Sequence, residues 1–207
     1  MRRIWMVLLL PLVLAACGAQ QVWAPEEDVQ RAIYRSDQPP SITLITVISN
    51  STGAGGHSAL LINGSQQLIF DPAGTFRHPQ LPERNDVVYG MQPEAVDFYI
   101  DYHARETYNV VTQELRVSPE VAELALQKAQ AYGAVAKAYC TKANTDILAG
   151  IPGFQDVPRT FFPKKLMQYF DNKPGVVRNV IYDDSPDNNG TIVAPVLYQA
   201  GARGAGI

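Results

Sequence analysis

The segment 41–49 is the feature that most restricts the folds open to this chain. Its sequence, SITLITVIS, is rich in β-branched residues and almost wholly apolar. A strand with one face in water would alternate between apolar and polar residues, and this segment does not. The sequence therefore predicts a central strand that is buried on both faces of its sheet.

Two further strands are predicted to pair as a hairpin. Residues 57–63 (HSALLIN) and 66–70 (QQLIF) have strand composition, and Asn63-Gly64 between them is a strong turn signal. The segment 71–74 (DPAG) ends the second strand. The remaining segments of strand composition lie at residues 86–91, 107–117 and 176–182.

Helices are indicated by capping patterns and apolar spacing. In Ser118-Pro119-Glu120 the serine is a suitable N-cap and the proline suits the first helical position, so a helix is predicted from here to about Tyr132. The other helix candidates are 25–33, 93–103, 140–148 and a segment that begins near residue 162. Since no repeat or long linker divides the chain, we expect one α+β domain at residues 25–185, with the sheet first in sequence and the helices after it.

The N-terminal residues are typical of a targeting segment. Residues 1–3 are short and basic, and the apolar run 4–14 is too short to span a bilayer. Leu14-Ala15-Ala16-Cys17 resembles the bacterial lipobox, in which the cysteine is acylated and becomes the first residue of the mature chain. The resemblance implies a signal peptide at 1–16 and a lipidated tether at 17–24. The alternative is an ordinary secretory signal with an incidental cysteine.

The charge and composition of the remaining chain restrict its location and partners. Without residues 1–16, 15 Lys and Arg stand against 20 Asp and Glu, a net charge of −5. We therefore expect no nucleic-acid partner, and membrane attachment only through the lipid on Cys17. Gly18 follows where an aspartate would suggest inner-membrane retention, which favours the outer membrane, facing the periplasm. Residues 186–207 are expected to be a partly disordered tail, with a Gly-rich end at 201–206.

Cys140 has no cysteine left to pair with if Cys17 carries a lipid, because the chain has two cysteines. A catalytic thiol needs a base, a group that orients the base and donors for an oxyanion. The predicted helix start at Cys140 would lower the thiol pKa. His57 and Asp71 each lie seven residues from Gly64, so the hairpin would make them cross-strand neighbours. The aspartate would then fix the tautomer of the imidazole.

These residues resemble a known family. Gly56-His57-Ser58 on a strand, a polar residue at the end of the next strand and a cysteine opening a later helix are similar to the permuted papain-like hydrolases related to NlpC-type cell-wall peptidases. His57 precedes Cys140 by 83 residues, the reverse of the unpermuted order. The resemblance covers about residues 41–150. It implies a circularly permuted papain-like fold, with a central antiparallel sheet and the catalytic cysteine at the N-terminus of a packed helix.

By this resemblance Cys140 would be the nucleophile, His57 the base and Asp71 the orienting group. The expected enzyme is an envelope-anchored cysteine hydrolase that cleaves an amide, first of all in a peptidoglycan stem peptide. Because the family includes lecithin retinol acyltransferase-like enzymes, lipid acyl transfer or deacylation is an alternative. A third possibility is a papain-like binding lipoprotein without catalysis, in which Cys140 would be a small buried side chain.

Other patterns give weaker signals. His78 and His103 are interpreted as structural, and the glycines at 53, 55 and 56 as positions of flexibility or close packing beside His57. The segment 183–190 (DDSPDNNG) lacks the closing glutamate of a calcium loop and is interpreted as a surface turn. No metal-ligand spacing or serine-hydrolase motif occurs, so no cofactor or metal is expected.

Overall fold

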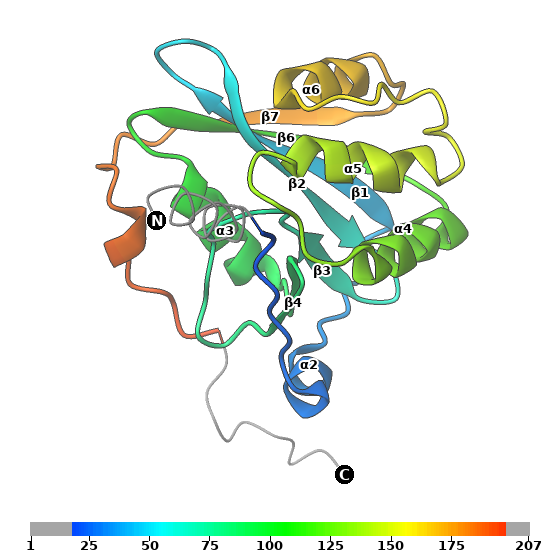
Figure 1. The fold of residues 1–207 in the computed structure, drawn as a ribbon, viewed down its shortest axis with the longest axis horizontal. Helices are drawn as coiled ribbons and strands as arrows, with labels where there is room; N and C mark the ends of the chain where they lie inside the picture. The colour runs from blue at the N-terminus through cyan, green and yellow to red at the C-terminus, as the bar shows by residue number, and fades with distance from the viewer. Residues whose placement is uncertain (1–17, 198–207) are drawn as a thin grey trace, which may run out of the picture.

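The structure is a computed structural model, and it describes residues 18–197 (Figure 1). Seven antiparallel strands form one sheet in the order β4-β5-β3-β2-β1-β6-β7. The strands are β1 (Ser41–Ser49), β2 (Gly55–Asn63), β3 (Gln67–Phe70), β4 (Glu83–Arg84), β5 (Val87–Tyr89), β6 (Tyr108–Arg116) and β7 (Val177–Ile181). The predicted α+β class and the central antiparallel sheet are confirmed.

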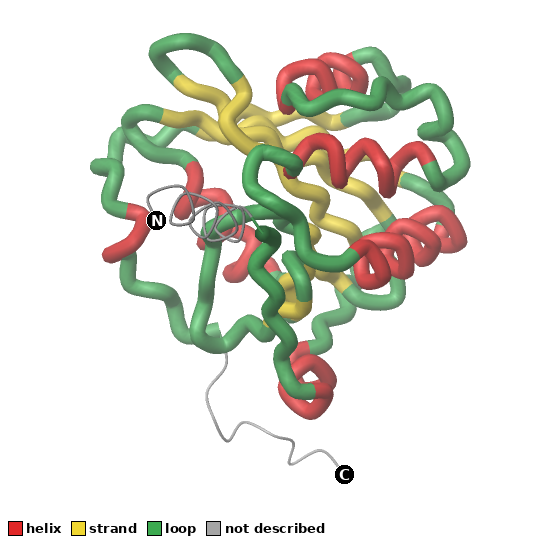
Figure 2. Tube along the Cα trace, in the orientation of Figure 1, coloured by secondary structure: helices red, strands yellow, loops and turns green. Residues whose placement is uncertain are grey.

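In the described part of the chain, five α-helices and one 3-10 turn surround the sheet (Figure 2). The elements are α2 (Glu26–Ala32), α3 (Pro93–His103), α4 (Pro119–Tyr132), α5 (Cys140–Ala149), α6 (Pro163–Asp171) and η1 (Asn189–Thr191). Within residues 18–197, none of these helices has the length and apolar character needed to cross a bilayer. The helix starts predicted at residues 93, 119 and 140 are confirmed to the residue.

Strand β1 is buried on both faces, as its composition predicts. Ile42 and Leu44 point toward the core that includes side chains of α4, α5 and α6. Ile45 and Val47, which alternate with them, point toward the core that includes α3. The α3 layer and the α4–α6 layer therefore cover opposite faces of the sheet (Figure 1). Strands β1, β2, β3 and β5 contribute buried side chains to both cores.

The hairpin of β2 and β3 forms with a different register from the one predicted. Its loop comprises residues 64–66, and Leu60 pairs with Phe70. In this register Ala59 would stand opposite Asp71, whereas the sequence analysis placed His57 there. The observed loop is centred on Ser65, whereas the prediction placed the centre of the turn at Gly64. This displacement of one residue changes which side chains stand opposite each other.

Two other features differ from the expectations. The short strand β4 has no counterpart in the sequence analysis, because two residues are too few for a periodic pattern. The predicted order of sheet first and helices after is wrong, since β6 follows α3 and β7 follows α6. Both β6 and β7 add to the sheet on the far side of β1.

The segment 186–197 packs against the body of the protein. The Gln92 side chain donates to the carbonyl of Leu197, and His78 Nε2 donates to the carbonyl of Pro195. Leu197 and Ile192 also contact the core on the α3 side. The packed domain therefore continues past the expected boundary at residue 185. The expected signal peptide, Cys17 and the Gly-rich segment 201–206 lie outside the described residues.

The two faces of β2 provide a test of the layer arrangement. Leu60 is fully buried on the α4–α6 side, whereas its neighbour Leu61 points to the α3 side and is partly buried. Leu60→Ala should therefore lower the free energy of unfolding by about 2–5 kcal/mol, and Leu61→Ala by clearly less. Urea denaturation of both variants measures the difference. Equal losses would contradict the assigned burial of β2.

Candidate active site

A buried polar network fixes the start of α5 against β2. Ser58, Thr141 and Asn144 are each 0% exposed. The hydroxyls of Ser58 and Thr141 are hydrogen bonded at 2.9 Å, and Asn144 Nδ2 donates to the carbonyl oxygen of Ser58 at 2.9 Å and to its Oγ at 3.1 Å. Since Thr141 follows Cys140 and Ser58 follows His57, this network brings the thiol to the side of the imidazole.

The site lies where β3 leaves β2. The ladder between these strands ends at the pair Leu60–Phe70, so His57 and Ser58 have no β3 partner beside them. The backbone N–H of Ser58 at this open edge is hydrogen bonded to the Cys140 thiol. Because β3 is absent here, the edge of β2 has a backbone donor, the Ser58 N–H, and space for the Cys140 side chain of α5.

His57 and Asp71 are in direct contact despite the shifted register. His57 Nε2 donates to Asp71 Oδ1 at 2.6 Å. The contact is diagonal: His57 points to the same face as Ala59, the residue that the register would put opposite Asp71. Asp71 is 2% exposed, so this carboxylate is one of the few buried acids in the described chain.

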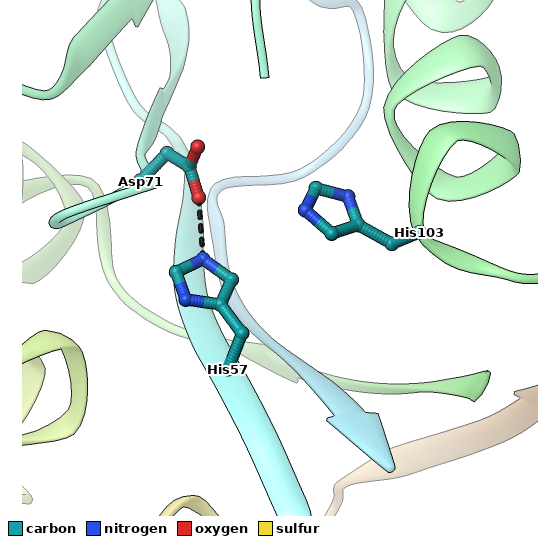
Figure 3. A group of neighbouring side chains, drawn as sticks. All are labelled: His57, Asp71 and His103. Carbon is teal, nitrogen blue, oxygen red and sulfur yellow. Dashed lines mark hydrogen bonds and ion pairs between the residues drawn. The ribbon is translucent and has the colours of Figure 1, made fainter. Parts of the chain in front are cut away.

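Two residues of α3 complete the surroundings of Asp71. The Tyr99 hydroxyl donates to the same Oδ1 at 2.6 Å. The His103 ring lies parallel to that of His57, with centroids 5.7 Å apart and an interplanar angle of 10°. Figure 3 shows His57 joined to Asp71 and His103 facing the pair from α3. The structure thus brings together His57, Asp71 and Cys140, and adds two residues that the sequence analysis did not assign to the site.

A signal for these two residues does exist in the sequence. Tyr99 and His103 are four positions apart in a predicted helix, so they share one face of it. That face is otherwise apolar and faces the sheet. Two polar groups on a buried helix face require partners, but the sequence cannot show that the partner is Asp71. His78, by contrast, lies away from the site and holds the C-terminal segment through Pro195.

The charges of His57 and Asp71 support each other. Burial lowers the pKa of His57, but the charge of Asp71 and its hydrogen bond, together with contacts to Cys140, outweigh burial and raise this pKa to about 10. For Asp71, burial raises the pKa, yet the charge and hydrogen bond of His57 and the hydrogen bond from the Tyr99 hydroxyl bring it below its ordinary value. At neutral pH the pair is therefore an imidazolium and a carboxylate.

Cys140 is a free cysteine and is buried, with 7% of its surface exposed. Burial raises its pKa, but a hydrogen bond and charge interaction with His57, the Ser58 backbone N–H and the Thr141 hydroxyl lower it to about 7. A free thiol has a pKa of about 8.5. The thiol of Cys140 is therefore substantially ionised at neutral pH, while its neighbour His57 is protonated.

His103 differs from His57 in charge. Burial lowers its pKa, and although Asp71 acts in the opposite direction, the net result is a pKa of about 4. Its Nδ1–H donates to the carbonyl of Tyr99 at 2.8 Å. The site therefore contains one protonated and one neutral histidine at neutral pH.

Within the described residues, His57, Asp71 and His103 form a group that could hold a metal ion, since one potential ligand atom of each lies within 4.8 Å of the others. The 2.6 Å between His57 Nε2 and Asp71 Oδ1 is a hydrogen-bond distance. Two ligands about 2.0–2.1 Å from one tetrahedral zinc ion would stand roughly 3.3 Å apart. The described geometry fits a hydrogen-bonded pair, and a metal would have to separate it.

Exposed aromatic side chains precede Cys140 and the start of α6 in the chain. Tyr139, the residue before Cys140, is 50% exposed and its ring contacts that of Phe161 at a centroid distance of 5.2 Å. Phe162 is 63% exposed. On the His57 side, Gly55 packs closely on the start of α6, because a Cβ there would lie 2.7 Å from Pro163 Cβ. These contacts connect the start of α6 to both halves of the site.

Comparisons with protein-family models, with curated proteins and with solved structures found no match to this chain.

The ionisation of Cys140 can be measured by its alkylation with iodoacetamide at a series of pH values, followed at this residue by peptide mass spectrometry. The rate should rise with a midpoint near pH 7. In His57→Ala the main stabilising partner of the thiolate is lost while burial remains, so the midpoint should move above the value of about 8.5 for a free thiol. His78→Ala is the control. If His57→Ala and wild type gave the same midpoint, the two side chains would not be coupled.

Gly74 tests the packing around the carboxylate. A Cβ at this position would lie 1.8 Å from Asp71 Oδ2, closer than any two atoms can approach without bonding. Gly74→Ala should displace the carboxylate, lower the free energy of unfolding by about 1–3 kcal/mol and raise the midpoint of Cys140 alkylation. Gly190→Ala is a matched control, because a Cβ there has no atom within 4 Å. Unchanged stability and midpoint in Gly74→Ala would contradict the described position of Asp71.

Proposed function

We propose that this protein is a cysteine hydrolase in which Cys140 is the nucleophile, His57 the base and Asp71 the group that orients the base. One observation carries the proposal: a buried carboxylate holds the imidazole that contacts a thiol of lowered pKa. A purely structural histidine and cysteine would not need a buried carboxylate beside them, because burying that charge is costly unless it is paired. An activated thiol explains all three residues together.

The proposed reaction passes through a thioester. The Cys140 thiolate attacks the substrate carbonyl carbon, and the carbonyl electrons move onto its oxygen. The imidazolium of His57 then gives its proton to the leaving amine as the carbon–nitrogen bond breaks. In the second half, His57 takes a proton from a water molecule that attacks the thioester, and Cys140 leaves as the thiolate. Asp71 keeps its charge throughout and holds the ring orientation.

Backbone donors near Cys140 are suited to stabilise the oxyanion. Cys140 is the first residue of α5, so its own N–H points out of the free end of the helix. The N–H of Ser58 reaches the same sulfur from the open edge of β2. A carbonyl attacked at this sulfur would have its oxygen near both donors, and removal of one such donor typically costs about 10²–10³ in rate.

The proposed family is the permuted papain-like hydrolases. The order of His57, Asp71 and Cys140 in the chain supports this proposal, as do the cysteine at a helix start and the histidine on a strand of an antiparallel sheet. With a lipid on Cys17 and a location at the outer membrane facing the periplasm, the substrate proposed first is the amide of a peptidoglycan stem peptide. The attachment and the location rest on the sequence alone.

Lipid deacylation or acyl transfer is the second proposed function. The exposed aromatic residues Tyr139, Phe161 and Phe162 favour it. Tyr139 directly precedes Cys140 in the chain and its ring contacts that of Phe161, so exposed apolar surface begins at the residue next to the proposed nucleophile. Such a surface suits an acyl chain better than it suits a polar peptide. The same catalytic residues serve both functions, since both reactions pass through an acyl group on Cys140.

A papain-like lipoprotein without catalysis is the remaining alternative. It is consistent with the low exposure of Cys140, which is 7%. It gives no reason, however, for the lowered thiol pKa or for the contact of His57 with both Asp71 and Cys140. These interactions favour a reactive thiol.

The proposal is tested by incubating the full chain with purified peptidoglycan and, separately, with phospholipid vesicles, and analysing the products by mass spectrometry. Product formation should be absent in Cys140→Ala, which lacks the nucleophile. It should fall by about 10²-fold or more in kcat for Asp71→Asn, since the amide no longer stabilises the imidazolium. His78→Gln should retain activity. Cleavage of peptidoglycan supports the first function and release of fatty acid the second. Equal turnover by wild type and Cys140→Ala would reject a thiol mechanism.

A further inference from the structure

The carboxylate of Asp71 is held by more than its histidine. Its Oδ1 accepts two hydrogen bonds of 2.6 Å, from His57 Nε2 and from the Tyr99 hydroxyl. Tyr99 is 0% exposed, so no water competes for this hydroxyl from bulk solvent. Hydrogen bonds to a charged acceptor in a buried setting are stronger than those between neutral groups. Tyr99 therefore stabilises the ionised form of Asp71 directly.

The second oxygen of the Asp71 carboxylate is closely packed. Oδ2 is buried and has no hydrogen-bond partner within the described residues. It faces Gly74, where even a single added methyl group would overlap with it. The close approach of Gly74 on one side and the Tyr99 hydrogen bond on the other hold the carboxylate with one oxygen toward His57.

His103 contributes a neutral ring. Its Nδ1 must carry the proton, because the Tyr99 carbonyl oxygen at 2.8 Å can only accept. The ring packs at 4.4 Å from the Tyr99 ring and stacks parallel to His57. A second cation at this position would compete with His57 for the charge of Asp71. A histidine that is held neutral leaves that charge to His57.

We infer that Tyr99 and His103 are positioning residues of this site: Tyr99 holds the Asp71 carboxylate ionised and aimed at His57, and His103 fixes Tyr99 and fills the space beside His57 without adding charge. This inference deepens the proposed function and rests on it. It extends the arrangement of Cys140, His57 and Asp71 by a third element, α3, on the face of the sheet opposite to α5. The ionisation of the thiol is then set in part by a helix on the other face of the sheet.

The neighbouring titratable groups determine how this inference is tested. Besides one another, Asp71, His57 and Cys140 interact with four further titratable groups of the described chain: Tyr99 and His103 from α3, Glu83 from β4, and Asp86 from the turn after β4. Glu83 and Asp86 are acids beside Asp71 whose own pKa values are raised by burial. They lie near the turn between β4 and β5 and remain in place when residues of α3 are changed, so their effect is constant across the variants.

The decisive variant is Tyr99→Phe in the full chain, which removes one hydroxyl and keeps the ring. Without its hydrogen bond, Asp71 stabilises the His57 imidazolium less, and His57 in turn stabilises the thiolate less. The midpoint of Cys140 alkylation by iodoacetamide should therefore rise by about one pH unit, a roughly tenfold loss of rate below the midpoint. The rate at high pH, where the thiol is fully ionised, should stay the same.

Tyr102→Phe is the matched control. Tyr102 lies on the same helix and also packs against His103, but its hydroxyl bonds to Thr75 and not to Asp71. Its alkylation profile should overlay that of wild type. A shift of equal size in both variants would overturn the inference, because it would indicate a general disturbance of α3.

The inference and the proposed function fail in different ways. If Tyr99→Phe overlays wild type while His57→Ala shifts the midpoint, the role of Tyr99 is overturned and the proposed function stands. If His57→Ala leaves the midpoint unchanged, the proposed function itself is contradicted. Nitrogen NMR of the histidines checks the charge assignment: His103 should remain the neutral Nδ1–H tautomer between pH 5 and 8, while both nitrogens of His57 carry protons. Titration of His103 in this range would overturn its assigned role.

Discussion

The need to compensate one buried carboxylate determines much of this structure. Asp71 is 2% exposed, and an unpaired charge in such a position would cost several kcal/mol. Its compensation draws on β2, through His57, and on α3, through Tyr99. The chain leaves the sheet after Phe70, which places the Asp71 carboxylate beside His57. Position 74 is glycine, and a side chain there would overlap with this carboxylate. The end of β3, the start of β2 and the middle of α3 are therefore fixed by the same charge.

On the opposite face of the sheet, an uncharged hydrogen-bond network of Ser58, Thr141 and Asn144 fixes the position of the Cys140 thiol. Ser58 points to the α5 side of the sheet and His57 to the α3 side, because neighbouring residues in a strand alternate. The bonds of Ser58 to Thr141 and Asn144 anchor α5 at the level of β2 where His57 also lies. In a continuous part of the sheet, α5 on one face could not reach a side chain on the other face. At residues 57–58 Cys140 of α5 can reach His57, because β3 has already ended and the edge of β2 is open.

The charged groups of the site are coupled pairwise, from α3 to the thiol. Tyr99 stabilises the charge of Asp71, Asp71 raises the pKa of His57, and His57 lowers the pKa of Cys140 against the effect of burial. His103 lies within this group but stays neutral, so it does not divide the charge of Asp71 between two rings. The outcome is a thiol with low exposure and high ionisation, two properties that rarely occur together because burial alone favours the neutral form. The exposed rings of Tyr139 and Phe161 contact each other at the residue before this thiol.

The sequence by itself determined the central strand at 41–49, the starts of α3, α4 and α5 and the three residues of the proposed triad, because these follow from local composition, capping and the separation of polar groups by a turn. It did not determine the register of the hairpin, where one loop residue more changes which side chains stand opposite each other. Nor could it assign Tyr99 and His103, whose spacing shows a shared helix face but not the partner of that face. Only the tertiary structure decided these points, since they depend on where α3 packs and where β3 ends. The meeting of Cys140 with His57 across 83 residues was likewise a matter of packing, settled by buried hydrogen bonds between β2 and α5 that no local pattern encodes.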